Sequence, residues 1–185
     1  MLTKEEQNFL EQQHIPISLV FNAIGKTKKQ YYNEMAEHGS LIAAGTIPCQ
    51  RGGHRLRTRH GHCVQCHTAY LAFVKRASEK AQLYIASSIK QKLVKVGSSK
   101  DADKRLKWLS SNGYGGANDW RIIHKLNHEQ AGRVELLTHS YLAKWKKQCS
   151  YIREGIQVDC REVFTADPAT AIAAMELACR MAKKQ

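Results

Sequence analysis

In the second half of the chain, short apolar runs alternate with stretches in which apolar residues recur at helical spacing. Residues 83–86 and 93–96 are apolar runs on either side of a polar turn, a pattern that predicts a β-hairpin. Residues 120–126 form a third apolar run, and residues 162–164 predict a further short strand. The pattern therefore predicts a small sheet in this half.

Helices are predicted between these strands. Residues 101–109 carry leucines on one face and are followed by an Asn-Gly pair, which is typical of a helix end. Residues 129–146 predict one long helix, because large apolar side chains recur three and four positions apart. A last helix is expected after Asp167, which can cap it, with Pro168 in the first helical position.

The N-terminal part of the chain predicts two short helices. Thr3 and Glu6 have the spacing of a capping box, so a helix is expected to begin here and to end before Pro16. Residues 28–37 predict a second helix that closes at Gly39.

Residues 41–73 have a different character, because glycine, histidine, arginine and cysteine replace the apolar periodicity. Such a polar segment is expected to have no interior of its own and to need a cross-link or a metal ion. We therefore expect an α+β protein in three parts. These are a helical segment over 1–40, a small module over 41–78 that is held together by a cross-link or a metal ion, and a main domain over 79–185.

Charge narrows the class of partner. The 185 residues carry a formal net charge of +13 at pH 7, far more than solubility requires, which indicates a polyanionic partner and first of all DNA. No run is long enough to span a bilayer, no basic amphipathic helix is evident, and the N-terminus lacks the apolar region of a signal peptide. We expect a cytoplasmic protein that binds no membrane.

Four residues of the polar segment have the spacing of a structural zinc site. Two thiolates from a Cys-x2-Cys turn and two ligands from an earlier Cys-x4-His pair can surround zinc tetrahedrally and leave no open position for a catalytic water. The predicted ligands are Cys49, His54, Cys63 and Cys66. His60, His62 and His67 compete for the histidine position, and His54 is preferred because the glycines before it can fold the chain back.

A redox role for the Cys-x2-Cys pair is disfavoured, because that motif needs a position between the strand and the helix of a βαβ unit, which the sequence does not predict here. Arg55, Arg57 and Arg59 alternate through the same segment. In an extended chain they project to one face and can contact successive DNA phosphates. The alternative is a solvated basic loop without a partner.

Four residues of the main domain are the parts needed to hydrolyse a phosphodiester. That reaction needs a base for water, a cation for the phosphate and a metal ion for the leaving oxygen. Tyr84 is the candidate base, and Lys95 is a cation that can lower its pKa. Arg105 carries a planar guanidinium that can donate hydrogen bonds to phosphate oxygens. Glu135, a carboxylate among apolar residues, is the candidate ligand of a catalytic Mg²⁺ or Mn²⁺. Taken alone, Tyr84 is better explained as a core residue, Arg105 can be a surface residue of a helix, and Glu135 can simply pair with a lysine or arginine.

The order of these residues resembles the GIY-YIG nuclease superfamily, most closely its phage-type and meiotically up-regulated branch. The matching segments are Leu83-Tyr84-Ile85, Val94-Lys95-Val96-Gly97-Ser98, Lys104-Arg105-Leu106, Arg133-Val134-Glu135-Leu136-Leu137-Thr138-His139 and Glu162-Val163-Phe164. The resemblance implies a three-stranded antiparallel sheet flanked by helices, with Tyr84, Lys95, Arg105 and Glu135 facing one cleft.

Two departures from the family pattern stand out. The first glycine of the GIY motif is absent, and Ser98 occupies a place where some relatives carry a catalytic histidine, so His124 and His139 become candidates to assist Tyr84. The sequence thus predicts a metal-dependent DNA endonuclease with a zinc module that aids DNA binding. The alternatives are a nucleic-acid-binding protein without turnover and a zinc-stabilised protein adaptor. The form of DNA that is cut stays open.

Overall fold

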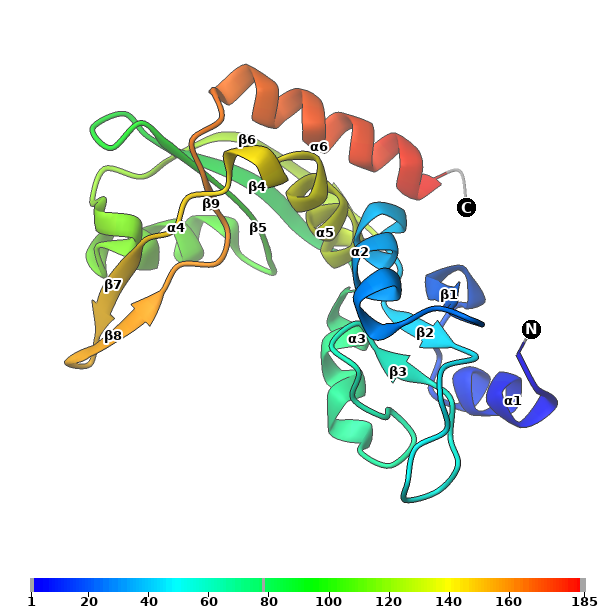
Figure 1. The fold of residues 1–185 in the computed structure, drawn as a ribbon. Coiled ribbons are helices and arrows are strands. Elements are labelled where there is room, and N and C mark those ends of the chain that lie inside the picture. Colours follow the sequence, from blue (N-terminus) through cyan, green and yellow to red (C-terminus); the bar gives the residue numbers. More distant parts are fainter. Residues whose placement is uncertain (1, 78, 184–185) are drawn as a thin grey trace. The chain divides into compact units, whose positions relative to one another are not determined.

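A computed structural model describes residues 2–77 and 79–183, and the chain divides into two compact units, residues 1–79 and residues 80–184 (Figure 1). The protein is α+β, with six helices and several small sheets among the described residues.

The first unit begins with the predicted helix α1 (Lys4–Gln12). The Thr3 hydroxyl accepts the N–H of Glu6 at 3.2 Å, and the Glu6 carboxylate accepts the N–H of Thr3 at 2.8 Å. This reciprocal capping box satisfies two backbone donors that would otherwise lack partners at the helix start.

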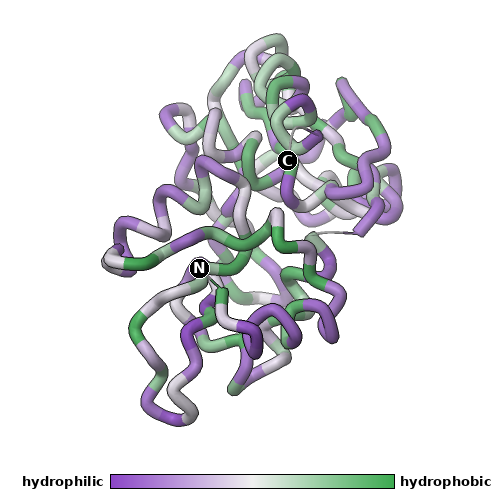
Figure 2. Tube along the Cα trace, turned by 90° about the vertical axis from the view of Figure 1, so that its right-hand side faces the viewer, coloured by the Kyte–Doolittle hydropathy of each residue, from purple (hydrophilic) through white to green (hydrophobic). Residues whose placement is uncertain are grey.

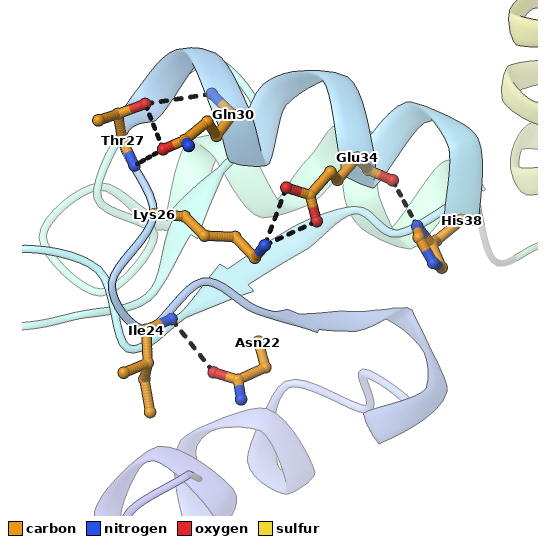
Figure 3. Close-up of polar contacts among 7 residues, drawn as sticks. All are labelled: Asn22, Ile24, Lys26, Thr27, Gln30, Glu34 and His38. Carbon is orange, nitrogen blue, oxygen red and sulfur yellow. Dashed lines mark hydrogen bonds and ion pairs between the residues drawn. The ribbon is translucent and has the colours of Figure 1, made fainter.

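The helix α2 (Lys28–His38) begins in the same way. The side chains of Thr27 and Gln30 cap each other's backbone N–H groups, as the close-up shows (Figure 3). Gly39 ends the helix with a φ of +62°, a conformation that glycine adopts without strain. Both N-terminal helices are thus confirmed.

The strands of the first unit were not predicted. They are β1 (Val20–Asn22), β2 (Ile42–Ala44) and β3 (Arg57–Thr58), joined in the order β1-β2-β3. The β1 and β2 strands run parallel and α2 connects them, while β3 runs antiparallel to β2. A βαβ unit is therefore present, although the Cys-x2-Cys pair follows β3 and lies outside it.

The expectation that residues 41–73 have no interior was wrong. Leu56 and Val64 are fully buried, and all three residues of β2 are buried as well. Periodicity missed this core because each contributing run is at most four residues long. The unit ends with a 3₁₀ turn at Thr68–Tyr70 and the helix α3 (Leu71–Ala77).

The second unit is built on an antiparallel sheet with the strand order β6-β4-β5-β9. Its strands are β4 (Ala81–Ser88), β5 (Leu93–Ser99), β6 (Arg121–His128) and β9 (Val163–Phe164). The resemblance implied three strands, and the structure has four, because the short segment near residue 163 pairs with β5 at the edge.

Helices cover one face of this sheet. They are α5 (Ala131–Tyr141) and α6 (Pro168–Lys183), and they bury Leu83, Ile85, Val94 and Val96 (Figure 1). The other face packs against α4 (Ala102–Ser111), a 3₁₀ turn at Tyr114–Gly116 and a hairpin of β7 (Ser150–Arg153) and β8 (Ile156–Asp159). Strand alternation therefore separates two cores and places Tyr84 on the second face.

The predicted helix over residues 129–146 is shorter than expected. It ends at Tyr141, and the following segment returns to the sheet, where Thr165 donates its N–H to the Trp145 carbonyl at 2.8 Å. A contact between residues distant in sequence thus overrides local helical periodicity. The predicted cap at Asp167 is confirmed, with its carboxylate accepting the N–H of Thr170 at 3.0 Å.

Hydrophobic and hydrophilic residues alternate over short distances along the chain (Figure 2). Within residues 2–77 and 79–183, no helix is both long and apolar enough to cross a membrane.

Candidate active site

The side chain of Tyr84, on β4, crosses the neighbouring strand β5 at the position of Gly97. The two residues are paired in the β4–β5 ladder, and a Cβ atom on Gly97 would lie only 2.7 Å from the Tyr84 hydroxyl oxygen. The tyrosine side chain can therefore run over β5 only because this position has no side chain. The glycine of the Lys-Val-Gly motif is explained by this close approach.

Lys95 is the buried cation of the site. It is 1 % exposed, and its ammonium forms an ion pair with Glu162. The Nζ atom lies 5.9 Å from the centre of the Tyr84 ring and 5.3 Å from that of Tyr114. Burial alone would lower the pKa of Lys95, but Tyr84 and Glu162 together raise it above its ordinary value. The lysine is therefore held as a cation.

Glu162 is a member of the site that the sequence prediction did not include. It directly precedes β9, and the pairing of Val163 with Lys95 brings it beside the lysine, 67 positions earlier in the chain. Burial opposes its ionisation, but Lys95 holds the pKa of Glu162 below its ordinary value, with smaller contributions from His139 and Arg105. The available signal is a carboxylate just before a buried strand, in the segment Glu162-Val163-Phe164 that takes part in the family resemblance.

Glu135 is a half-buried carboxylate on α5. The Ser98 hydroxyl donates to its Oε2 atom at 2.5 Å, and no cation forms an ion pair with it in the described part of the chain. Burial, followed by the charge of Glu162, raises the pKa of Glu135 to about 7. A carboxylate in this setting fits a divalent cation, because bound charge would relieve both the burial and the repulsion.

Arg105 lies on α4 with its guanidinium 4.4 Å above the Trp108 ring. Stacking fixes the plane of the guanidinium, and the N–H groups around its rim are the donors suited to phosphate oxygens. The positive charges of Lys95 and Arg105 both lower the pKa of Glu162. Lys95 also interacts electrostatically with Tyr84 and Glu135. Glu162 therefore links Arg105 to this group of residues.

The two histidines considered as helpers of Tyr84 have other surroundings. His139 lies one turn after Glu135, and its Nε2 donates to the Val96 carbonyl at 3.2 Å. Burial lowers the pKa of His139 to about 4, so the ring is neutral at pH 7. His124 has a buried Nε2 without a hydrogen-bond partner among the described residues. In the described part of the chain, neither histidine forms a hydrogen bond with Tyr84.

A second cluster lies in the first unit, where four metal-binding side chains converge. One donor atom from each of Cys49, His54, Cys63 and Cys66 lies within 4.8 Å of all the others. The distances from His54 Nδ1 to the three sulfur atoms are 3.7, 3.8 and 3.3 Å. Tetrahedral zinc with bonds of about 2.0–2.3 Å requires ligand separations of about 3.3–3.8 Å, so the cluster fits this ion.

Local backbone geometry supports the cluster. Gly52 and Cys66 donate their N–H groups to the sulfur atoms of Cys49 and Cys63, at 3.3 and 3.5 Å. A Cβ on Gly52 would lie 2.6 Å from the His54 ring, which explains the glycine before the histidine. Burial and the two neighbouring thiols raise the pKa of Cys66 to about 11, so three thiolates need a cation to coexist.

The three arginines of the same module make separate contacts. Arg55 Nε lies 3.7 Å from the Glu6 carboxylate, Arg57 donates to the Ile47 carbonyl at 3.0 Å, and Arg59 lies 4.7 Å above the Tyr32 ring. Only Arg57 belongs to a strand. Together with Arg51, it lines a hollow of about 370 Å³ beside the cysteines.

The second unit is therefore a small α+β domain with a buried group of charged side chains, and the first unit carries a separate Cys/His cluster that could hold a metal ion. Residues 81–179 match the T5orf172 domain, so the chain belongs to this family, a phage-associated domain of the endonuclease type. No curated protein and no solved structure matches the chain.

Proposed function

We propose that the protein is a DNA endonuclease of the GIY-YIG type that depends on Mg²⁺ or Mn²⁺. The observation that carries this proposal is the buried ammonium of Lys95, which brings Tyr84 and two carboxylates, Glu135 and Glu162, into one electrostatic group. Buried charges are costly, and such clusters are typical of active sites. Membership of an endonuclease-type family supports the same function.

Each residue has a separate role in this proposal. Tyr84 accepts a proton from the attacking water, and Lys95 supplies the positive charge that a phenolate needs nearby. Arg105 binds the phosphate and stabilises the charge that develops on its oxygens. Glu135 holds the divalent ion, which would supply Lewis-acid stabilisation of the leaving oxygen.

The first unit has a supporting role in this proposal. Zinc bound by the four ligands of the cluster would stabilise the module over residues 41–78 without taking part in hydrolysis. Three arginine side chains of the module leave their present contacts and bind DNA phosphates, which are stronger hydrogen-bond acceptors because they are charged. These are Arg55, Arg57 and Arg59. The helical segment 1–40 packs with this module, and residues 79–185 form the catalytic domain.

One observation favours a second candidate function. Tyr84 is 1 % exposed, so its hydroxyl is enclosed in the structure as it stands. A protein that binds nucleic acid without cleaving it would tolerate an enclosed tyrosine, whereas a nuclease must open this position to water.

The decisive experiment is a cleavage assay with duplex, single-stranded and forked DNA in the presence of Mg²⁺ or Mn²⁺. We expect Glu135→Gln to abolish cleavage and to leave DNA binding intact, and Tyr84→Phe to slow cleavage by about 10²- to 10⁴-fold, the usual contribution of a general base. Glu129→Gln is the matched control, because Glu129 is an exposed acid that pairs with Lys80.

Two results would contradict the proposal. Metal-dependent cleavage that survives both substitutions would mean that the active site lies elsewhere. Absence of cleavage by the unmodified protein on all three substrates, combined with DNA binding, would establish the second candidate function.

A further inference from the structure

The turn that follows β3 carries a histidine ring on either side of Gly61, and each ring contacts a tyrosine, one edge-to-face and the other stacked. On one side, the His60 ring lies 5.5 Å from that of Tyr32 on α2. On the other side, the His62 and Tyr70 rings are 4.4 Å apart and nearly parallel, with 10° between their planes. We call these four residues the ring patch. Gly61 itself adopts a φ of +90°, which allows the tight turn between the two histidines.

These rings are accessible although they are large and aromatic. Tyr70 is 38 % exposed, and both histidines of the patch are exposed as well. Burial of the rings in a core therefore does not account for the stacking of His62 on Tyr70. The pair presents a flat surface that is already organised, so a further planar group can stack on it with little loss of side-chain freedom.

Positive charge surrounds the ring patch. The guanidinium of Arg59 lies 4.7 Å above the Tyr32 ring. A Cβ on Gly61 would lie 2.9 Å from the side chain of Lys28, so this lysine lies against the turn. Flat rings beside cations are the combination with which proteins bind single-stranded nucleic acids, because each unpaired base can stack while its phosphate meets a cation.

We propose that the ring patch binds single-stranded DNA by stacking unpaired bases on the His62–Tyr70 pair. The proposal rests on the proposed DNA-binding function and adds the form of DNA that the first unit recognises. Duplex DNA keeps its bases inside the helix and offers the patch only its backbone. The patch therefore favours strands that are single, frayed or forked, without reading their sequence.

Removal of the bases from the DNA tests this proposal directly. A fluorescent 12-mer of thymidine and an abasic 12-mer have the same phosphates, and their binding to the full chain is compared by anisotropy without added divalent ions, so that no cleavage occurs. Stacking contributes about 1–3 kcal/mol per base, so we expect the thymidine strand to bind about 5- to 150-fold more tightly. Tyr70→Ala should remove most of this difference, and Tyr70→Phe should keep it.

Controls separate stacking from general effects. Phe73→Ala removes an aromatic ring of 63 % exposure from the same unit, outside the ring patch, and should leave the preference for bases unchanged. The salt dependence of binding should be equal in Tyr70→Ala and the unmodified protein, because the ring carries no charge. Zinc content and melting temperature show whether each variant is folded.

The outcomes are distinct. Equal binding of the two strands by the unmodified protein would overturn the proposal even if Tyr70→Ala did not fold. Equal losses in Tyr70→Ala and Phe73→Ala would overturn it as well. If the base preference is found in a protein that cleaves no DNA, the ring patch is established and the proposed endonuclease function fails separately.

Discussion

Replacement of Gly97 by alanine tests how closely the position of Tyr84 is fixed. The added Cβ would lie 2.7 Å from the hydroxyl oxygen and 2.8 Å from the ring carbon that bears it, whereas ordinary contact begins at 3.4 Å. The tyrosine must therefore move by about 0.7 Å. Overpacking of this kind costs about 1–3 kcal/mol of unfolding free energy.

The effect on activity should exceed the effect on folding. Misplacement of a reacting group by about 1 Å costs on the order of 10²-fold in rate, so Gly97→Ala should slow DNA cleavage by about 10- to 100-fold. Cleavage of labelled DNA under single-turnover conditions measures the rate, and urea unfolding measures the stability. In a Tyr84→Phe background the same alanine should have little further effect on the rate, because the group that it displaces is already gone.

Two results would refute this reasoning. A Gly97→Ala variant with unchanged rate and unchanged stability would mean that the tyrosine does not lie against β5. A loss of rate that is equally large in the Tyr84→Phe background would mean that alanine acts through folding or through another residue.

Three further predictions concern charge and metal. The pKa of Glu135 is raised from 4.5 to about 7, so the stability that its proton contributes is fully present below pH 4.5 and is lost as the pH rises through 7. Glu135→Gln should therefore stabilise the metal-free protein by about 3 kcal/mol at pH 8 and have little effect at pH 4.5; equal unfolding curves at pH 8 would contradict this. Metal analysis should find about one zinc per chain, and Cys66→Ser should lower both zinc content and melting temperature. Protein purified without chelator that contains no zinc would exclude the structural site. Replacement of Arg55, Arg57 and Arg59 by alanine should reduce the salt slope of DNA binding by up to about three, and an unchanged slope would show that the module does not contact phosphates.

Local patterns predicted the elements whose signals lie close together in the sequence. The capping box at Thr3, the β4–β5 hairpin and the Asp167 cap each depend on residues within a few positions of one another. The same holds for the four zinc-ligand candidates, which lie within eighteen residues and converge in the structure. Sequence spacing is sufficient to predict that two groups meet where the chain between them is short and has few possible conformations.

Features that depend on distant contacts were missed. The early end of α5 follows from the hydrogen bond between Thr165 and Trp145, and Glu162 joins the site only because β9 pairs with β5. The β7–β8 hairpin was missed for a different reason, because its signal is local. It turns at Glu154 and Gly155, which both adopt positive φ, but most residues of its strands are exposed, so no clear alternation of apolar and polar residues marks them.

The position of β9 has a consequence for the order in which the protein becomes functional. Tyr84, Lys95, Arg105 and Glu135 all leave the ribosome before Glu162, the carboxylate that pairs with Lys95. In a growing chain whose second sheet contains only β4, β5 and β6, Lys95 lacks its ion-pair partner Glu162. Burial then disfavours the charged form of the lysine. The contribution of Glu162 to the charged state of Lys95 is added to that of Tyr84 only when β9 pairs with β5 at the edge of the sheet. The electrostatic group around Lys95 is therefore complete only after the segment that contains Glu162 and β9 has been synthesised.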